Sequence, residues 1–283
     1  NVASGYNALR SNTSGSQNTA VGVSTLYSNT TSHYNTAVGA QALYDNTGGG
    51  HTAIGYNALN NNTSANYNTA VGFDALFSNT TGGDNCAVGT NSLRANTTGA
   101  NNNAFGRNAL NTNTTGTDNS AYGYEALYSN TTGTANVAIG VNSLKFNTSG
   151  SANVALGNAA LWQNTGSNNV AVGYYALLQN TSATSNTGVG TNCMQVTTTG
   201  GNNTAVGRDS LRYNTTGSLN TTSGVNSLFS NTTGSNNTAS GYDALHSCST
   251  GSHNVAIGDA ALYNITTGSG NIGIGFRNSS GGY

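Results

Sequence analysis

Residues 18–50 read NTAVGVSTLYSNTTSHYNTAVGAQALYDNTGGG, so the phrase Asn-Thr-Ala-Val-Gly occurs twice, ending once at Gly22 and again at Gly39. The glycine that closes this phrase recurs 17 times along the chain, and 14 of the 16 intervals share a period of 17. The intervals from Gly39 to Gly55 and from Gly157 to Gly173 are shorter by one, because each lacks a residue of the Asn-Thr-Thr-Gly segment. A segment that tolerates a deletion is expected to be a turn. Self-similarity of this kind predicts a repeat architecture.

Each repeat can be numbered from its glycine as position 0. Position −4 is Asn in 16 of 17 copies, position +4 is Leu in 15 of 17, position +7 is usually Asn and position +8 is nearly always Thr. The register runs through residues 1–283, which predicts one repeat domain that is a segment of a longer fibre. The last copy is irregular, and residues 276–283 are interpreted as a degenerate C-terminal closure.

The composition excludes several function classes. Asn (48) and Thr (42) outnumber Gly (39), Pro is absent, charged residues make up 5% of the chain and the net charge is −1. Binding to nucleic acid or to an anionic membrane surface needs a basic patch, which this chain lacks. No apolar run has the roughly 18 residues of a membrane span, so we expect no membrane insertion in this segment. The three cysteines occupy three different repeat positions, which gives no disulfide framework and no metal spacing.

A repeat of this length is too short for two packed helices but long enough for one coil of a parallel β-solenoid. We therefore predict an all-β parallel β-solenoid, or β-roll, of about 17 coils, each with two short strands and two turns. Positions −3 and −1 share a strand face, and we expect them to line a thin core with Leu at +4 and Ala at +3. At about 4.8 Å per coil, such a rod would be on the order of 80 Å long.

The charged residues support this assignment of the exterior. All 15 fall at positions −5, +1, +2, +5 or +6, and burying an unpaired charge costs several kcal/mol. Stacked coils also place each Asn at −4 and +7 beside its equivalent in the next coil. The amide groups can then bond along the stack as Asn ladders that satisfy turn groups.

The phrases NTAVG, NVAIG and NVALG resemble the head repeats of trimeric autotransporter adhesins. The longer phrase NTAVGxxALxxNTTGxxN is similar to repeats of phage tail-fibre-like proteins that carry a C-terminal endosialidase-type chaperone. The resemblance covers essentially the whole chain and implies a left-handed β-roll in a homotrimer. The unit is a few residues longer than the usual adhesin repeat, and no stalk, anchor or chaperone sequence is present.

The small residues at −2 and 0 give an argument for self-association that does not depend on the resemblance. Position −2 is Ala in 14 of 17 copies and position 0 is always Gly. If −3 and −1 face inward, −2 and 0 face outward, where small residues would let another chain approach closely. The alternative is that the Gly serves only a bend and the Ala is merely a neutral small residue.

Exposed aromatic residues are the candidate recognition surface, because Tyr, Trp and Arg are typical of such surfaces and ring faces stack on sugars. They occupy positions +1 and +5, which also carry Arg and Lys. The alternative is that these rings stack for stability or cover a groove between chains. The candidates are Tyr27, Tyr44, Tyr56, Phe73, Phe77, Tyr124, Tyr128, Trp162, Tyr174, Phe229, Tyr242 and Tyr263.

Several Asn residues at +7 fit the N-x-[ST] glycosylation motif and are expected in an exposed turn. The alternative is that the turn needs Asn and Thr for its own geometry. The candidates are Asn12, Asn29, Asn79, Asn96, Asn130 and Asn231.

No catalytic or cofactor site is predicted. His33, His51, His246 and His253 fall at four different positions, the acids form no pair of the glycosidase kind, and the glycine-rich turns lack the lysine of a phosphate-binding loop. We expect no enzyme, no metal and no cofactor.

Three functions remain. The first is an extracellular structural or adhesive fibre on a cell or virus surface, with a host glycan or protein as receptor and copies of itself as partners. The second is a filament or sheath subunit that polymerises end to end. The third, an ice- or crystal-binding solenoid, needs outward Thr-x-Thr columns on a flat face. It is disfavoured because Thr at −3 alternates with an expected buried Val at −1, and because Thr at +8 and +9 are adjacent rather than alternating.

The two ends of the chain carry a further expectation. A solenoid with bare terminal strands would offer a template for association, so we expect upstream repeats or a docked subunit at residues 1–5. Phe276 to Tyr283 are expected to form an irregular closure or contact.

Overall fold

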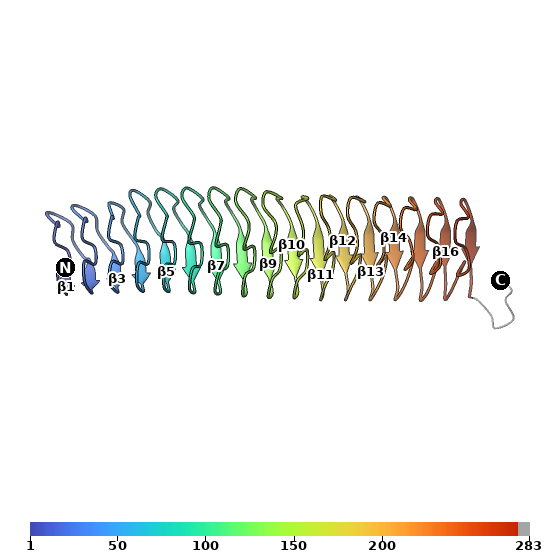
Figure 1. The fold of residues 1–283 in the computed structure, drawn as a ribbon, viewed down its shortest axis with the longest axis horizontal. Coiled ribbons are helices and arrows are strands. Elements are labelled where there is room, and N and C mark those ends of the chain that lie inside the picture. Colours follow the sequence, from blue (N-terminus) through green and yellow to red (C-terminus); the bar gives the residue numbers. More distant parts are fainter. Residues whose placement is uncertain (277–283) are drawn as a thin grey trace. The chain divides into compact units, whose positions relative to one another are not determined.

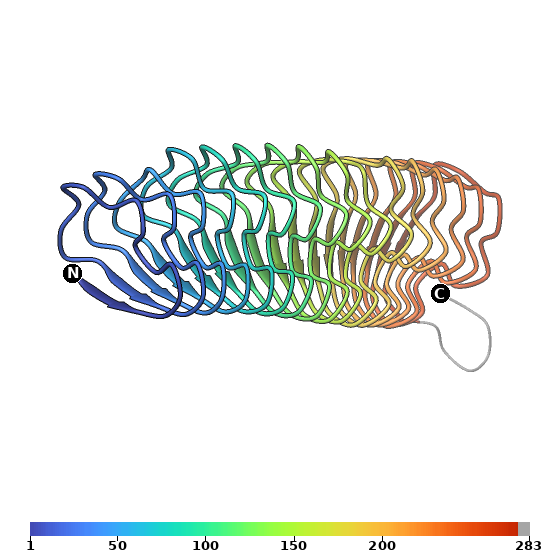
Figure 2. The same cartoon turned by 60° about the vertical axis from the view of Figure 1, so that its left-hand side comes forward.

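Each repeat contributes one short strand to a parallel sheet. The computed structural model describes residues 1–276, and the chain divides into two compact units, Asn1–Asn142 and the part from Ser143 onward. Figures 1 and 2 show one arrow in each coil, on the same side of the coils within a unit. The first unit contains β1 (Val2–Ser4), β2 (Thr19–Val21), β3 (Thr36–Val38), β4 (Thr52–Ile54), β5 (Thr69–Val71), β6 (Cys86–Val88), β7 (Asn103–Phe105), β8 (Ser120–Tyr122) and β9 (Val137–Ile139). The second contains β10 (Val154–Leu156), β11 (Val170–Val172), β12 (Thr187–Val189), β13 (Thr204–Val206), β14 (Thr221–Ser223), β15 (Thr238–Ser240), β16 (Val255–Ile257) and β17 (Ile272–Ile274).

The predicted β-solenoid is confirmed in each unit. Successive strands pair in parallel with equivalent positions opposite each other, as Ala20 pairs with Ala37. The two short coils keep this register, since Ala37 pairs with Ala53 and Ala155 with Ala171. The missing residue is therefore absorbed in the turn, as the position of the deletion indicated. The prediction of one repeat domain for the whole chain stays a prediction.

The prediction of two strands per coil is wrong. Positions +1 to +6 form turns in which +2 and +4 have left-handed backbone, such as Asn57 with φ 56° and Leu43 with φ 51°. These turns still bond from coil to coil, because the Leu43 N–H donates to the Ala58 carbonyl at 3.0 Å. A left-handed non-glycine residue costs of order 1 kcal/mol. Burial of the leucine, worth about 1.5–3 kcal/mol, offsets that cost.

The core is lined by Ala at −2, and the expectation that −3 and −1 face inward is wrong. Ala37 is fully buried, whereas Val38 beside it is 37% exposed. In every strand from β2 to β16 the middle residue is buried and the flanking ones are half-buried or exposed. The Leu column at +4 is buried as predicted, and Leu59, Leu76 and Leu93 each have no exposed surface. The strand passes close to these leucines, and the buried −2 position holds small residues, Ala in most coils, with Thr222 the largest.

The glycine at position 0 is required by contacts within the chain. Gly89 has φ 132°, and a Cβ placed on it would lie 2.6 Å from the carbonyl oxygen of Gly106. This column therefore lets neighbouring coils of one chain stack. With Ala at −2 buried, the argument that an outward Ala and Gly face packs against another chain fails.

The predicted Asn ladders are confirmed in both columns. At −4, the Asn35 N–H donates to Asn18 Oδ1 at 3.0 Å, and at +7 the Asn96 Nδ2 donates to Asn79 Oδ1 at 2.8 Å. The two columns also converge on one turn carbonyl, since Asn68 Nδ2 and Asn79 Nδ2 both donate to the Gly82 carbonyl at 2.9 Å. These buried amides hold each turn against the next and leave few turn groups without partners.

At the ends, residues 1–5 are exposed, as is Phe276. The rest of the predicted closure, residues 277–283, lies outside the described residues.

Candidate recognition surface

The aromatic residues at +1 lie on the exterior, as predicted. Exposed fractions are 47% for Tyr56, 50% for Phe73, 41% for Tyr124, 47% for Tyr174 and 56% for Tyr242. Because the repeat places them in one column, neighbouring rings meet, and the centroids of Tyr56 and Phe73 are 5.4 Å apart in a stacked arrangement. This column presents ring faces and edges to solvent.

The aromatic residues at +5 are half-buried and make more contacts with one another. Tyr27 stacks on Tyr44 with centroids 4.9 Å apart and 3° between the planes. Phe229 and Tyr263 stack on opposite sides of His246, at 5.0 and 4.9 Å. Half-buried rings at this position also include Phe77 and Tyr128. The stability interpretation therefore has direct support here, because each stacked pair contributes about 0.5–1.5 kcal/mol.

Cationic side chains cover several of these rings. The Arg10 guanidinium lies 5.6 Å from the centroid of Tyr27, and Arg107 lies 5.7 Å from that of Tyr124. Arg94 covers Phe77 at 5.4 Å. The columns at +1 and +5 thus combine π faces with positive charge, which suits aromatic or polyhydroxylated ligands.

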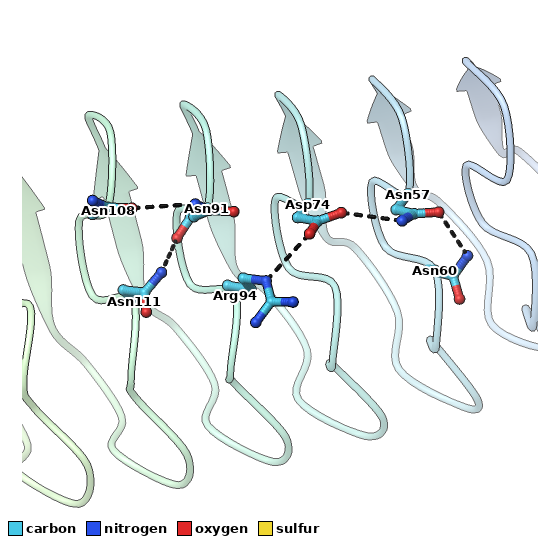
Figure 3. A network of polar contacts seen from close by, with 7 residues as sticks. All are labelled: Asn57, Asn60, Asp74, Asn91, Arg94, Asn108 and Asn111. Carbon is cyan, nitrogen blue, oxygen red and sulfur yellow. Dashed lines mark hydrogen bonds and ion pairs between the residues drawn. The ribbon is translucent and has the colours of Figure 1, made fainter.

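A polar network runs along the first unit between the +2 and +5 columns (Figure 3). Asn57 Nδ2 donates to Asp74 Oδ1 at 3.1 Å, and Arg94 Nε donates to Asp74 Oδ2 at 3.2 Å. Asp74 is only 8% exposed. The expectation that charged residues lie on the outer side of the coil therefore holds for Asp74, but this carboxylate at +2 is covered and paired rather than solvated.

A surface hollow of about 630 Å³ borders Trp162 in the second unit. Its lining includes Phe146, whose ring meets the Trp162 ring edge-on at 4.8 Å, and Thr165 of the short coil. Lys145 Nζ lies 5.3 Å from the Phe146 ring centroid. Trp162 is thus a predicted residue that lies at a concave site.

The outward strand face carries residues that the sequence analysis assigned to the core. Phe105 and Tyr122, both at −1, stack on this face with centroids 4.9 Å apart and 4° between the planes. Val21, Ile54 and Ile139 are 39%, 41% and 44% exposed at the same position. One of the two reasons for disfavouring ice binding, a buried residue at −1, is therefore wrong.

The expectation that the sequons lie in an exposed turn is wrong for five of the six asparagines. Their side chains belong to the buried +7 ladder, so the Nδ2 atom that would carry a glycan is enclosed. Asn12, in the first coil, is half-buried and donates to the Gly15 carbonyl at 3.0 Å. The five fully buried residues are Asn29, Asn79, Asn96, Asn130 and Asn231.

His51 replaces Asn in the −4 ladder and reproduces its bonding. Its Nδ1 accepts the Asn68 N–H at 3.1 Å, and Nε2 lies 2.8 Å from the Ala65 carbonyl, which fits a neutral ring protonated at Nε2. Burial lowers the pKa of His51 to about 4. Because its partners belong to the backbone and the ladder, the residue is structural.

The cysteines are free thiols. Burial raises the pKa of Cys193 to about 12 and also raises that of Cys248. Within residues 1–276 there is no group of three or more metal-ligating side chains, and no helix there could cross a membrane.

No family model matches the chain, and no curated protein matches it. The surface must therefore be interpreted from its own residues. The sequence analysis missed Tyr34 and Tyr67 at −5, 68% and 67% exposed. The charged residues at that position, Asp84 and Asp118, already marked it as exterior.

Proposed function

We propose that this chain is a segment of an extracellular, non-enzymatic fibre that projects or presents a binding surface on a cell or virus particle. The observation that carries the proposal is the repeated display of exposed aromatic and cationic side chains on coils that bond to each other all round. Such a scaffold lengthens by adding repeats, and each added coil adds one more position to every surface column. The resemblance to adhesin heads and tail-fibre repeats favours the same function.

The ring column at +1 supplies the contact surface in this proposal. A host-surface glycan or protein would lie along the column and bury the exposed faces of Tyr56 and Phe73. Binding of the purified chain to host cells or to an immobilised glycan panel tests this. We expect the double variant Tyr56→Ser and Phe73→Ser to weaken binding at least about tenfold. The matched control is Val23→Ser, which changes an exposed, non-aromatic residue of the same column. Equal binding by both variants would contradict the proposed contact surface.

The proposal includes homo-oligomerisation, with a trimer as the resemblance implies. The Ala and Gly argument for it failed, and a different surface now supports it. The exposed Val and Ile column at −1 is an apolar stripe of the kind that interfaces cover. Packing of this stripe against a second copy of the chain would remove it from water. Native mass measurement of the chain is expected to show an oligomer that Val38→Lys combined with Ile54→Lys converts to monomer. An oligomer unaffected by that change would place the interface elsewhere.

Ice or crystal binding is a second candidate, favoured by one observation. In β2 to β5, Thr at −3 and Val or Ile at −1 face outward together, on strands about 4.8 Å apart. A regular face of hydroxyl and methyl groups could match a crystal lattice. Thermal hysteresis and inhibition of ice recrystallisation would reveal this activity, and Val38→Lys should abolish it. Their absence at high protein concentration would eliminate this candidate.

A further inference from the structure

One surface hollow of the first unit lies where the repeat loses a residue. The coil from Gly39 to Gly55 has no residue at position +9, so Thr47 is followed directly by Gly48, Gly49 and Gly50. The preceding coil carries Thr31 at +9, and the following coil carries Ser64. The result is a notch of about 420 Å³ over Gly49 and Gly50, within the range of roughly 300–1,000 Å³ for small-molecule sites.

The floor of the notch is backbone that its neighbours hold in place. The Gly49 N–H donates to Asn66 Oδ1 at 2.9 Å, and the Gly50 N–H donates to the His33 carbonyl at 3.1 Å. On the other side, the Tyr67 N–H donates to the Gly49 carbonyl at 3.1 Å. The glycines of the floor carry no side chains, and these bonds on both sides already order the backbone.

The walls of the notch are aromatic. Tyr34 and Tyr67 occupy position −5 of coils on either side of the short one, and Gly50 occupies that position between them. A Cβ on Gly50 would lie 2.7 Å from Cδ1 of Tyr67, so the Tyr67 ring leans over the glycine. His33 lies beside Tyr34 with ring centroids 6.1 Å apart. Any side chain at Gly50 would remove the space that the Tyr67 ring uses.

The chemistry of the lining selects a ligand class. The lining includes the rings of Tyr34, Tyr67 and His33, the hydroxyl residues Thr31 and Thr47 and the amide residue Asn66, and it contains no Asp, Glu, Lys or Arg. Ring faces pack on the C–H surface of a pyranose, and hydroxyl, amide and imidazole groups bond to its hydroxyl groups. A phosphate or carboxylate would meet no Lys or Arg in this lining.

We propose that the notch over Gly49 and Gly50 binds a neutral saccharide, with one pyranose ring between Tyr34 and Tyr67. The proposal deepens the proposed function by naming a ligand class, but its site is separate from the +1 and +5 columns. The deletion in this turn is then a functional departure from the repeat rather than a neutral length change.

The experiment is saturation-transfer NMR and titration calorimetry of the full chain with neutral methyl glycosides of glucose, galactose and N-acetylglucosamine. We expect saturable binding of at least one glycoside, weakened at least about tenfold by Tyr67→Ser. Insertion of a Thr after Thr47 restores the full-length coil and should fill the notch and abolish binding. Tyr213→Ser, at a ring that is 41% exposed and lies outside the +1 and +5 columns and outside the notch, is the matched control and should bind like the original chain.

Two results would overturn the proposed site. One is that the chain binds none of the glycosides, and the other is binding that Tyr67→Ser and the Thr insertion both leave unchanged.

Tetramethylammonium, tested in parallel, would overturn the ligand class if it alone bound, because a cage of rings can also hold a cation. Hydrogen exchange of the variants shows whether they are folded. If the insertion variant does not fold, Tyr67→Ser still tests the site, because it changes an exposed ring. The Tyr56→Ser and Phe73→Ser variant separates this site from the proposed contact surface, since it should leave glycoside binding intact.

Discussion

The two units share one coil geometry but differ in the completeness of their +7 ladders. In the first unit every +7 residue from Asn12 to Asn130 is Asn, and from Asn29 onward each side-chain amide donates to the preceding one at 2.8 to 3.2 Å. In the second unit Thr197 and Cys248 interrupt the column and Ile265 ends it. Asn180 Oδ1 and Asn231 Oδ1, which precede the interruptions, are buried without a hydrogen-bond partner, as is Thr197 Oγ1.

This difference shows which columns of the repeat tolerate substitution and which do not. The ladder is broken twice and the coils on either side keep their shape, whereas +4 is Leu or Met in every coil of the described residues. A missing ladder bond leaves an acceptor unsatisfied, at a cost of about 1–3 kcal/mol. A lost core side chain removes a larger burial term and leaves a cavity. The core column should therefore tolerate less change than the ladder.

The largest effect is expected in the core. Leu127→Asp places an unpaired charge in a fully buried position and should unfold the surrounding coils, at a local cost above about 4 kcal/mol. Hydrogen–deuterium exchange of the peptides around residue 127 measures it. Ile139→Asp is the control, since that side chain is 44% exposed and should be tolerated. An equal loss of protection in the two variants would indicate that the side chain at −1 points into the core.

Acid should weaken the first unit at His51, where the −4 ladder departs from Asn. The folded-state pKa is lowered from 6.5 to about 4, so between these values the unfolded chain binds a proton that the folded chain excludes. Stability is full above pH 6.5 and falls as pH drops toward 4, by about 3 kcal/mol. Exchange rates near residue 51, measured from pH 7 to 4 and corrected for intrinsic rates, report the loss.

His51→Asn is the matched variant, because Asn is the residue of the other coils. It should remove this part of the pH dependence and keep the ladder intact. A pH profile identical to that of the original chain would show that His51 does not carry the acid sensitivity.

Breaking the intact ladder should have the next effect. Asn96→Ala leaves Asn79 Oδ1 without its donor and deprives Asn113 Nδ2 of an acceptor, so we expect a local loss of about 2 kcal/mol. Exchange at peptides covering residues 79–113 is the measurement. Asn158→Ala changes an exposed amide outside the left-handed positions and should cost less than about 0.5 kcal/mol in its own coil. If the two variants behave alike, burial of the ladder contributes nothing.

Repairing the broken ladder should have the smallest effect, with the opposite sign. Thr197→Asn supplies a donor to Asn180 Oδ1 and an acceptor to Asn214 Nδ2, and should stabilise the second unit locally by about 1 kcal/mol. Slower exchange around residues 180–214 would show it. Thr199→Asn, at an exposed turn position, should change nothing. Faster exchange in Thr197→Asn would mean that this coil has no room for the longer side chain.

Much of the fold followed from periodicity. The period of 17 and the Leu column predicted one coil per repeat, and the Asn columns predicted the ladders. Two features did not follow. Period-two alternation says that −3 and −1 share a face but not which way that face points. The left-handed backbone of Leu43 and its equivalents also contradicts local preference, because only burial in the stacked structure stabilises a leucine in that conformation.

The sequence by itself determined the repeat, its coil length, the position of the turn deletions and the residues that stack. Each of these depends on spacing alone, since equal spacing places equal residues side by side. Only the tertiary structure decided the inward side of the strand, because the distance between strand and leucine column sets the side-chain volume that fits: Ala at −2, with Val and Ile outside. It also decided that most of the sequon amides are buried and that the missing residue after Thr47 opens a notch between Tyr34 and Tyr67, since both depend on how neighbouring coils close over a turn.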